Sequence, residues 1–424
     1  MIKLPKEVNQ VLKKLEAAGF EAFTAGACVR DSMMGSTPLD WDIVTSAGIQ
    51  ELKKLIPGAD ILSEENSIVR IDKTQGGDEN AVILDISTFR RGTGAEGPLF
   101  CHSIEEDLAG RHFTIDAMAD NPARPLKDPY KGREDIKARL VRTIGDPAEA
   151  FEQDPILMLE AILLAAELDF DLPKDVYEAM VAKSALLGQA DVGARRELFA
   201  DIIVARHAGK GLRMLAGAEL MPALVGDIAL KLSARERGLF SDLADGIDKL
   251  KPVVERRLGL FYMCFEKKGL WAIEKLKYDT KTHQHLTDAM TQMTKIYFLA
   301  NKTELKNYIY NVGMERYDYL QNLAKAHKIV YPQGNVKVEN RHYMMEEIVK
   351  NNEPIFLEDL AITRQDIIDA GIADDEKADR LLQLLPALVH RKPNLNQKED
   401  LLKHARKFSK NKLKAAFRGV EWLK

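Results

Sequence analysis

The chain has 424 residues, of which 46% are hydrophobic and 30% charged, and a formal net charge of -4 at pH 7. This composition is typical of a folded protein long enough for several domains, and it excludes a disordered chain and a uniformly basic nucleic-acid binder. It also excludes a helical membrane protein, because no apolar run approaches the roughly 20 residues that span a bilayer. We therefore expect a cytoplasmic protein without a membrane partner.

The first third of the chain predicts a mixture of helices and strands. Its first 20 residues have the pattern of an amphipathic helix rather than of a signal peptide. Short apolar runs, bounded by Gly, Pro or polar residues, predict strands at 22–26, 41–45 and 81–88. Short helices are predicted at 30–35 and 51–58, where glycine or proline ends the helical pattern.

Glycine and cysteine usage adds two further expectations. The stretch RRGTGAEGP, residues 90–98, contains four Gly or Pro residues and predicts a mobile loop. The cysteines, Cys28, Cys101 and Cys264, are odd in number and form no CxxC pair, so neither a disulfide framework nor a zinc site is indicated. We expect all three to be reduced and buried.

Beyond the loop GDPAEAFEQDP, residues 145–155, the pattern becomes almost entirely helical. This change predicts the main domain boundary. The end of the chain is strongly basic, with 11 Lys and Arg against 3 Asp and Glu in residues 391–424. Such a segment is suited to contact phosphates, but it is equally typical of the water-facing side of a terminal amphipathic helix.

Two carboxylates lie one residue apart in the predicted strand that contains Asp40, Trp41 and Asp42. Because side chains alternate between the faces of a strand, Asp40 and Asp42 should point to one face and Trp41 to the other. Two close carboxylates repel each other unless a cation lies between them. Magnesium favours one or two protein carboxylates together with phosphate oxygens. The pair alone is a weak signal, because surface strands also carry aspartates, but together with the glycine turn and the arginine upstream it predicts a Mg²⁺ site.

A turn upstream of this pair points to phosphate. Gly26 and Ala27 lead into the predicted start of a helix, where free backbone amides and the helix dipole favour an anion. Arg30, in the first turn, is placed to add a charge-assisted contact. Asp85, in the strand VILDIST, is a third candidate carboxylate, although a strand aspartate can also serve only as a hydrogen-bond acceptor.

These residues resemble a known family, the class II nucleotidyltransferases, which include CCA-adding enzymes and bacterial poly(A) polymerases. GACVRDSMMGSTPLDWDIVTSA resembles the family's signature, and EEDLAGRHFTIDAMADNP resembles its motif DLxxRDFTxNAMA. The resemblance continues in order along nearly the whole chain, through DPYKGREDIKARLVRTIGDPAEAF, QDPILMLEAILLAAELDFDL, IEKLKYDTKTHQHL and LAITRQDIIDAGI.

The resemblance implies an α+β fold, with a nucleotidyltransferase head containing a mixed β-sheet, followed by all-α domains. We expect the head at 1–145, a helical neck at 146–225, a body at 226–335 and a tail at 336–424. It also implies template-independent addition of CMP, AMP or both to the 3′ end of tRNA or another RNA, with CTP and ATP as substrates.

The resemblance further implies roles for individual residues. Asp40 and Asp42 match the aspartates that bind two Mg²⁺ ions, and we add Asp85 as a candidate catalytic carboxylate. The nucleotide-binding positions match Gly26, Ala27, Arg30, Arg111 and Asp154, and Ala27 stands where the family usually has glycine.

The neck departs from the family pattern. Three arginines that meet the incoming nucleotide are replaced by Leu157, Glu160 and Leu163, which removes three positive charges and adds one negative charge. In the head, His112 replaces an aspartate and Asp116 an asparagine. Charge-assisted hydrogen bonds contribute roughly 1.5 to 3 kcal/mol each, so nucleotide binding or selection should be altered unless other residues supply the charge.

Two functional hypotheses follow. The first is an active nucleotidyltransferase with altered nucleotide selection, which the intact Asp40 and Asp42 pair favours. The second is a catalytically impaired paralogue that acts as an RNA-binding or regulatory protein, which the changed neck favours. Basic residues in the turn GARREL, Arg195 and Arg196, would support the first hypothesis if they pointed into the nucleotide pocket.

Overall fold

The computed structural model describes residues 2–38, 40–72, 82–94, 97–332 and 339–410. The chain divides into two compact units. Unit 1 comprises Met1–Lys231 with Glu274–Lys277, and unit 2 comprises Leu232–Ile273 with Tyr278–Lys424. The predicted division into head, neck, body and tail stays a prediction.

Unit 1 begins with a mixed six-stranded sheet. Its strand order is β3-β4-β5-β2-β1-β8, and β2 pairs with β5 in parallel while the other neighbours are antiparallel. The strands are β1 (Ala22–Ala25), β2 (Asp40–Thr45), β3 (Asp60–Ser63), β4 (Ile68–Asp72), β5 (Ile83–Thr88) and β8 (Ala119–Asp120). A separate hairpin consists of β6 (Arg90–Gly94) and β7 (Gly97–Phe100).

Helices make up most of the remaining structure. Those of unit 1 are α1 (Lys6–Ala17), α2 (Ala27–Met33), α3 (Ile49–Leu55), α4 (Ile104–Ala109), α5 (Gly132–Ala138), α6 (Pro147–Gln153), α7 (Leu157–Leu168), α8 (Lys174–Lys183), α9 (Val192–Val204), α10 (Ala208–Gly217) and α11 (Met221–Val225). Those of unit 2 are α12 (Ala234–Gly246), α13 (Val254–Met263), α14 (Gly269–Ile273), α15 (Thr280–Phe298), α16 (Lys302–Val312), α17 (Met314–Val330), α18 (Glu339–Lys350), α19 (Arg364–Asp369), α20 (Asp375–Leu382), α21 (Leu385–Arg391) and α22 (Lys398–Lys410). The predicted α+β fold class is confirmed.

The predicted strands and helices before residue 90 are confirmed within a few residues at each end, although Ala81 of the third predicted strand lies outside the described residues. The predicted loop at 90–98 is wrong, because most of it forms the hairpin β6–β7. The antiparallel pairing of the hairpin continues beyond its two strands, because the Cys101 amide donates to the Phe89 carbonyl at 3.0 Å. Gly92 and Gly97 adopt positive φ angles of 126° and 118°, so glycine here shapes a bulged hairpin.

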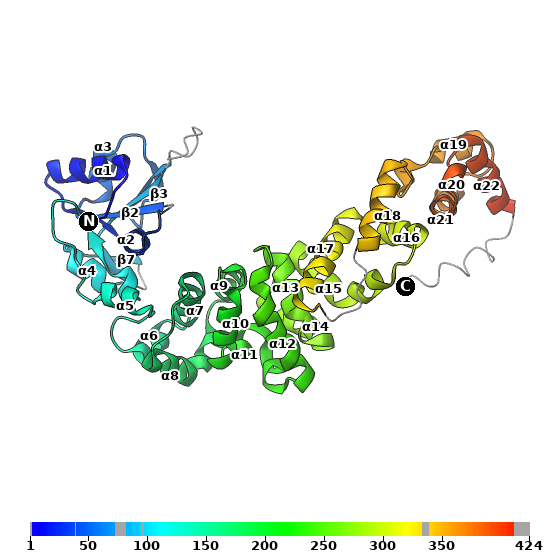
Figure 1. Ribbon diagram of the computed structural model, residues 1–424. Helices are drawn as coiled ribbons and strands as arrows, with labels where there is room; N and C mark the ends of the chain where they lie inside the picture. The colour runs from blue at the N-terminus through cyan, green and yellow to red at the C-terminus, as the bar shows by residue number, and fades with distance from the viewer. Residues whose placement is uncertain (1, 39, 73–81, 95–96, 333–338, 411–424) are drawn as a thin grey trace. The chain divides into compact units, whose positions relative to one another are not determined.

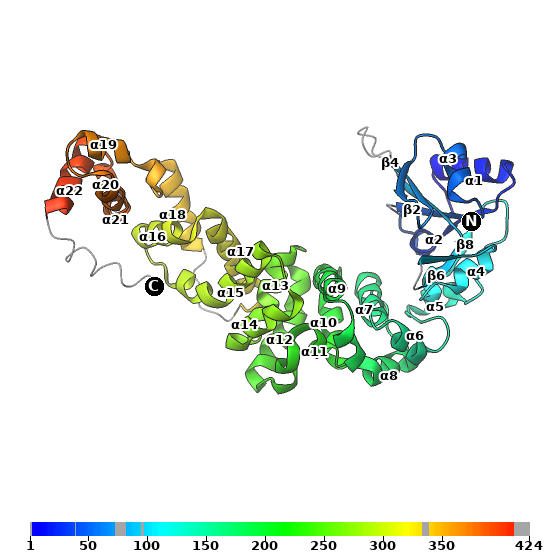
Figure 2. The same ribbon diagram turned by 180° about the vertical axis from the view of Figure 1, so that it is seen from behind.

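The sheet has an apolar cluster on each face. On one face, side chains of β2 such as Trp41 and Ile43 pack with α1, α2 and α3. On the other face, Val44 packs with Ile104 and Leu108 of α4. Figures 1 and 2 show α1 and α3 on one side of the sheet and α4 on the other. Because Asp40, Asp42 and Val44 alternate with Trp41 and Ile43, both aspartates lie on the α4 side.

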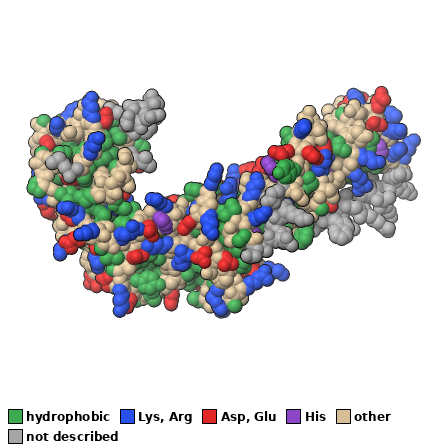
Figure 3. Space-filling view, in the orientation of Figure 1, with side chains coloured by type: hydrophobic (Ala, Val, Ile, Leu, Met, Phe, Trp, Pro, Cys, Tyr) green, Lys and Arg blue, Asp and Glu red, His purple; other side chains and the backbone are tan. Residues whose placement is uncertain are grey.

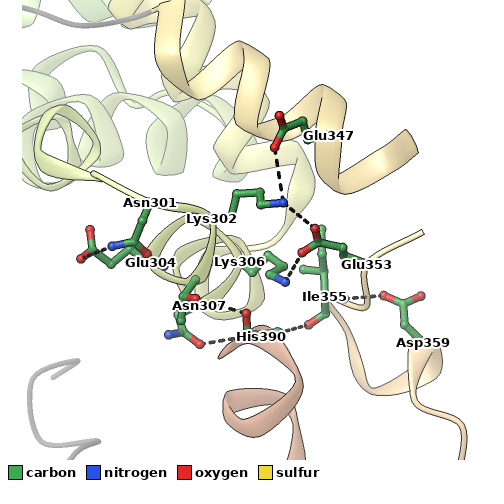
Figure 4. Close-up of polar contacts among 11 residues, drawn as sticks. Asn301, Lys302, Glu304, Lys306, Asn307, Glu347, Glu353, Ile355, Asp359 and His390 are labelled. Carbon is green, nitrogen blue, oxygen red and sulfur yellow. Dashed lines mark hydrogen bonds and ion pairs between the residues drawn. The ribbon is translucent and has the colours of Figure 1, made fainter. Parts of the chain in front are cut away.

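Unit 2 contains a buried polar cluster that joins three segments (Figure 4). The Lys306 side chain on α16 is buried, and its Nζ donates to Glu353 Oε2 at 2.5 Å. Lys302 Nζ donates to the other oxygen of Glu353 at 2.7 Å. The ring of His390 on α21 contacts Asn307 Oδ1 at 2.6 Å and the Ile355 carbonyl at 2.8 Å. These contacts hold α16, the segment after α18, and α21 together.

The surface of α22 is basic. Figure 3 shows Lys and Arg side chains gathered over this helix, which exposes Lys403, Arg406, Lys407 and Lys410. The rest of the predicted basic segment, 411–424, lies outside the described residues. All three cysteines are free and buried, as expected. Among the described helices, none combines the length and apolarity needed to cross a membrane.

The buried cluster predicts a stability effect. Replacing Lys306 by Met (Lys306→Met) removes one of the two cations that neutralise buried Glu353, so we expect the free energy of local opening to fall by about 3 kcal/mol. Hydrogen exchange of α16 and α21 amides in the full-length protein measures this change. The control is Glu347→Gln, because Glu347 reaches the same Lys302 at 3.4 Å from a side chain that is 64% exposed. Equal protection in the two variants would contradict the prediction.

Candidate functional site

Strand β2 places the two adjacent carboxylates on one face of the head sheet. Asp40 is exposed and Asp42 half-buried, while Trp41 between them is only 2% exposed and packs in the core. Within the described part of the chain, neither carboxylate has a hydrogen-bond or ion-pair partner. The alternation expected from the sequence is therefore present, and both side chains are available to a ligand.

Electrostatics at Asp42 favour a bound cation. Burial raises the pKa of its carboxyl above the ordinary value, Arg111 and Arg90 lower it, and the carboxylates of Asp85 and Asp40 raise it further. A raised pKa means that the ionised form is disfavoured in the folded protein. A divalent cation between Asp40 and Asp42 would relieve this repulsion, so the donor set fits Mg²⁺, which prefers carboxylate oxygens.

Asp85 lies beside Asp42 but already has a partner. The parallel register of β2 and β5 places Asp42 opposite Asp85 on the same face. Arg70 on β4 donates to both Asp85 oxygens, from Nε at 2.7 Å and from Nη2 at 2.6 Å. Among the described residues, no group of three His, Cys, Asp or Glu side chains is arranged to hold a metal. The catalytic role of Asp85 stays a prediction.

The turn before α2 brings the backbone close to an arginine. Gly26 has a φ angle of 80°, and a Cβ atom at this position would lie 2.5 Å from Arg111 Nη1. The positive φ angle favours glycine here, and the absence of a side chain lets the Arg111 guanidinium approach the turn. The neighbouring Ala27 is exposed at the start of the helix. Phosphate binding by Gly26 and Ala27 stays a prediction.

Arg30 is buried and paired within the protein. Its Nε donates to Asp31 Oδ1 at 2.8 Å, and its Nη1 donates to Asp116 Oδ1 at 2.6 Å. Two carboxylates thus neutralise the guanidinium that the sequence assigned to phosphate. Asp116 is the residue that replaces the family's asparagine, so the substitution itself provides one of the two charges. A phosphate contact by Arg30 stays a prediction.

Arg111 is held by a buried carboxylate. Its Nη2 and Nε donate to Asp107 Oδ1 at 3.1 and 3.3 Å. The other oxygen, Asp107 Oδ2, accepts a hydrogen bond from the Arg90 amide at 3.0 Å. Asp107 therefore fixes both the arginine beside Asp42 and the start of the β6–β7 hairpin.

Several of the residues described above line a cavity of about 840 Å³ within unit 1. The head contributes charged side chains to its wall, including Asp42, Arg90, Arg111 and Asp116. Helices α7 and α9 and the end of α6 contribute the opposite wall, including Asp154, Glu160, Leu163 and Leu198. The cavity therefore brings Asp42 together with the neck positions Asp154, Glu160 and Leu163, whereas Asp40 is not among the described residues that line it.

The neck wall is acidic and apolar. Asp154 Oδ1 accepts a hydrogen bond from the Ile156 amide at 3.0 Å. Burial raises the pKa of Glu160, His112 lowers it, and Asp154 and Asp116 raise it. Leu163 also lines the cavity, whereas Leu157 is 3% exposed and belongs to the apolar core.

Arg195 and Arg196 do not replace the missing neck arginines. Arg195 Nη1 donates to the Ala223 carbonyl at 2.5 Å. Arg196 Nη1 donates to the carbonyls of Leu276 at 3.2 Å and Lys277 at 3.0 Å. Neither is among the described residues that line the cavity. The condition under which Arg195 and Arg196 would support the first hypothesis is therefore not met by the described structure.

Sequence reasoning missed Arg90 as a functional residue. Its side chain lines the cavity, and its charge acts on Asp42. The signal was the pair Arg90 and Arg91 directly after the predicted strand at 81–88, but the following glycines led to the prediction of a mobile loop.

Residues 22–142 match the family model described as the poly A polymerase head domain. Over 265 aligned residues, the chain is 28% identical to a CCA-adding enzyme of Bacillus licheniformis. The aligned region covers 62% of this chain and 61% of that relative. The chain thus spans about three fifths of the length of this curated relative. The chain is therefore similar to poly A polymerases in its head and to CCA-adding enzymes over about three fifths of its length.

Solved structures extend the similarity of fold beyond the head. The crystal structure of the Bacillus stearothermophilus CCA-adding enzyme in complex with CTP has a TM-score of 0.76, with 22% identity over 96% of this chain and 99% of that chain. The Thermotoga maritima CCA-adding enzyme complexed with tRNA has a TM-score of 0.63, with 17% identity over 95% and 96% of the two chains. The protein therefore has the fold of CCA-adding enzymes along nearly its whole length.

The unpaired Asp42 predicts separable effects on metal binding and on stability. Asp42→Asn should weaken Mn²⁺ binding more than tenfold, because it removes one of two anionic ligands. It should leave the unfolding free energy of the metal-free protein unchanged or raise it by up to ~1 kcal/mol, because a carboxylate with a raised pKa costs stability once it is ionised at pH 7.

Electron paramagnetic resonance of bound Mn²⁺ and urea unfolding of the metal-free protein measure the two effects. Asp60→Asn, at an exposed position on β3, is the matched control. Equal Mn²⁺ affinity in both variants would refute the assignment of Asp42 as a ligand.

Proposed function

We propose that this protein adds CMP, AMP or both to the 3′ end of tRNA without a nucleic-acid template. The observation that carries the proposal is the pair of carboxylates Asp40 and Asp42, which have no hydrogen-bond or ion-pair partner among the described residues. Asp42 lines a cavity of about 840 Å³ together with Arg90 and Arg111, which is large enough for a nucleotide. In this reaction the RNA 3′ oxygen bonds to the α-phosphorus, the bond to the β-phosphate oxygen breaks, and pyrophosphate leaves. The 3′ hydroxyl proton passes to solvent or a base.

The side chains in the cavity suit this reaction. Arg111, held by Asp107, offers positive charge beside Asp42 for the triphosphate. Asp40 and Asp42 would hold two Mg²⁺ ions, which supply charge neutralisation of the phosphates and lower the pKa of the attacking hydroxyl when bound. One solved relative is a complex with CTP and another a complex with tRNA, which supports these substrate classes. Because tRNA and nucleoside triphosphates are present in the cytoplasm, we place the reaction there.

We propose that nucleotide selection is altered. The neck wall presents Asp154 and Glu160, and Leu163 stands where a third cationic side chain is expected. Carboxylates accept hydrogen bonds but cannot donate them when ionised, so this wall can contact exocyclic amino groups of a base and repels its carbonyl oxygens. The acidic wall also favours the second candidate function, an RNA-binding protein with impaired catalysis, because it opposes the approach of a polyanionic nucleotide.

A single assay separates the two candidates. Purified protein with Mg²⁺ is given each labelled NTP separately and tRNA that ends before CCA, after CC, or with the complete CCA. We expect addition of at least one nucleotide from CTP or ATP and none with Asp42→Asn. If folded wild-type protein binds tRNA but adds no nucleotide, the RNA-binding function is favoured and the transferase is rejected.

The charge of Glu160 should weaken nucleotide binding. Glu160→Gln keeps the size of the side chain and removes one negative charge from the cavity, so we expect about fivefold tighter binding of CTP or ATP, from roughly 1 kcal/mol of relieved repulsion. Titration calorimetry at fixed ionic strength measures the affinity. Glu149→Gln, at an exposed position on α6, is the control and should leave the affinity unchanged. An unchanged affinity in Glu160→Gln would show that the nucleotide does not approach this wall.

A further inference from the structure

The hairpin β6–β7 presents a defined face to the cavity. Phe89 and Cys101 are buried, and the Cys101 amide donates to the Phe89 carbonyl at 3.0 Å. The next pair outward is Arg90 opposite Phe100. Directly opposite residues of an antiparallel pair share one face, with Cβ atoms about 5 Å apart. Arg90 lines the cavity and its charge acts on Asp42, so the face of the hairpin that carries Phe100 is the face that carries this cavity-lining arginine.

The hairpin is fixed rather than free to swing. The Arg90 amide donates to buried Asp107 Oδ2 at 3.0 Å. A Cβ atom at Gly110, directly after α4, would lie 2.3 Å from the Cα atom of Arg91. Glycine at position 110 therefore lets the hairpin pack directly against the end of α4. The position of Phe100 relative to Asp42 follows from these contacts.

Phe100 is an exposed aromatic side chain next to unneutralised positive charge. Its side chain is 44% exposed, although burial of a phenyl ring is strongly favourable in water. Among the described residues, the guanidinium groups of Arg90 and Arg91 have no hydrogen-bond or ion-pair partner. An aromatic ring beside free arginines is the combination with which proteins bind single-stranded nucleic acid, through base stacking and phosphate contacts.

We propose that Phe100 stacks on the 3′-terminal base of the RNA and thereby positions its 3′ hydroxyl at the Asp40 and Asp42 pair. This inference rests on the proposed function. The incoming nucleotide has its own base-binding wall on the neck, formed by Asp154, Glu160 and Leu163. The hairpin is on the head, whereas that wall is on the neck. Of the two reactants, Phe100 can therefore contact the RNA rather than the incoming nucleotide. Arg90, between Phe100 and Asp42, is placed to pair with the terminal phosphate.

The hairpin supplies a matched control. Leu99 precedes Phe100 on β7, points to the opposite face of the hairpin and is 46% exposed. Phe100→Ala and Leu99→Ala therefore remove similarly exposed apolar side chains from the same strand, and only the first is on the cavity face. Phe100→Trp retains an aromatic surface and should restore function.

The experiment uses full-length protein and a tRNA that ends before CCA and carries 2-aminopurine as its last nucleotide. Stacking on an aromatic ring quenches this fluorophore, so wild type, Leu99→Ala and Phe100→Trp should quench it and Phe100→Ala should not. In the incorporation assay, Phe100→Ala should lower kcat/KM for tRNA about 5- to 100-fold, the range expected for one lost stack, while KM for CTP stays unchanged.

The outcomes separate the inference from the function on which it rests. Fluorescence needs no catalysis, and binding of unlabelled tRNA is measured in parallel. If wild-type protein does not bind tRNA, the proposed function and the stacking both fail. If it binds tRNA and Phe100→Ala quenches as strongly as wild type, or Leu99→Ala loses as much activity, the stacking alone is overturned.

Discussion

Repulsion between carboxylates on one face of the head sheet is the constraint around which the site is arranged. The pairing of β2 with β5 brings Asp42 and Asp85 side by side, with Asp40 on the same face. Arg70 neutralises Asp85 through two hydrogen bonds, whereas Asp42 has a raised pKa and, among the described residues, no hydrogen-bond or ion-pair partner. Arg111 and Arg90 offset part of the repulsion at Asp42, and a bound cation would relieve the rest.

Buried Asp107 links this pair to the rest of the cavity. One oxygen holds Arg111 and the other holds the Arg90 amide, so a single carboxylate positions positive charge beside Asp42 and anchors the β6–β7 hairpin. Arg30 plays no such part in the structure, since Asp31 and Asp116 already neutralise it. Asp116, which stands where the resemblance leads us to expect asparagine, supplies one of the two carboxylates that pair with Arg30.

The neck shows why single substitutions have to be judged in three dimensions. Three lost arginines appear equivalent in the sequence, but Leu157 is part of the apolar core while Glu160 and Leu163 face the cavity. An arginine at 157 would have to be desolvated, whereas the charge at 160 acts directly on the cavity. Burial raises the pKa of Glu160, so the ionised form of this side chain is disfavoured at that wall.

Local patterns in the sequence determined the fold class and the strand that contains Asp40 and Asp42, and they placed both aspartates on one face. These patterns are the alternation of side chains along a strand and the glycines that end helices and strands, and both depend only on residues close together in the chain. Motifs that occur in order along the chain also determined its resemblance to the class II nucleotidyltransferases. Only the tertiary structure decided which charges are neutralised, because the partners of Arg30 and Asp85 are distant in the chain or on another strand. It also turned the glycine-rich segment 90–98 into a hairpin, since the buried pairing of Phe89 with Cys101 outweighs the local tendency to form a loop.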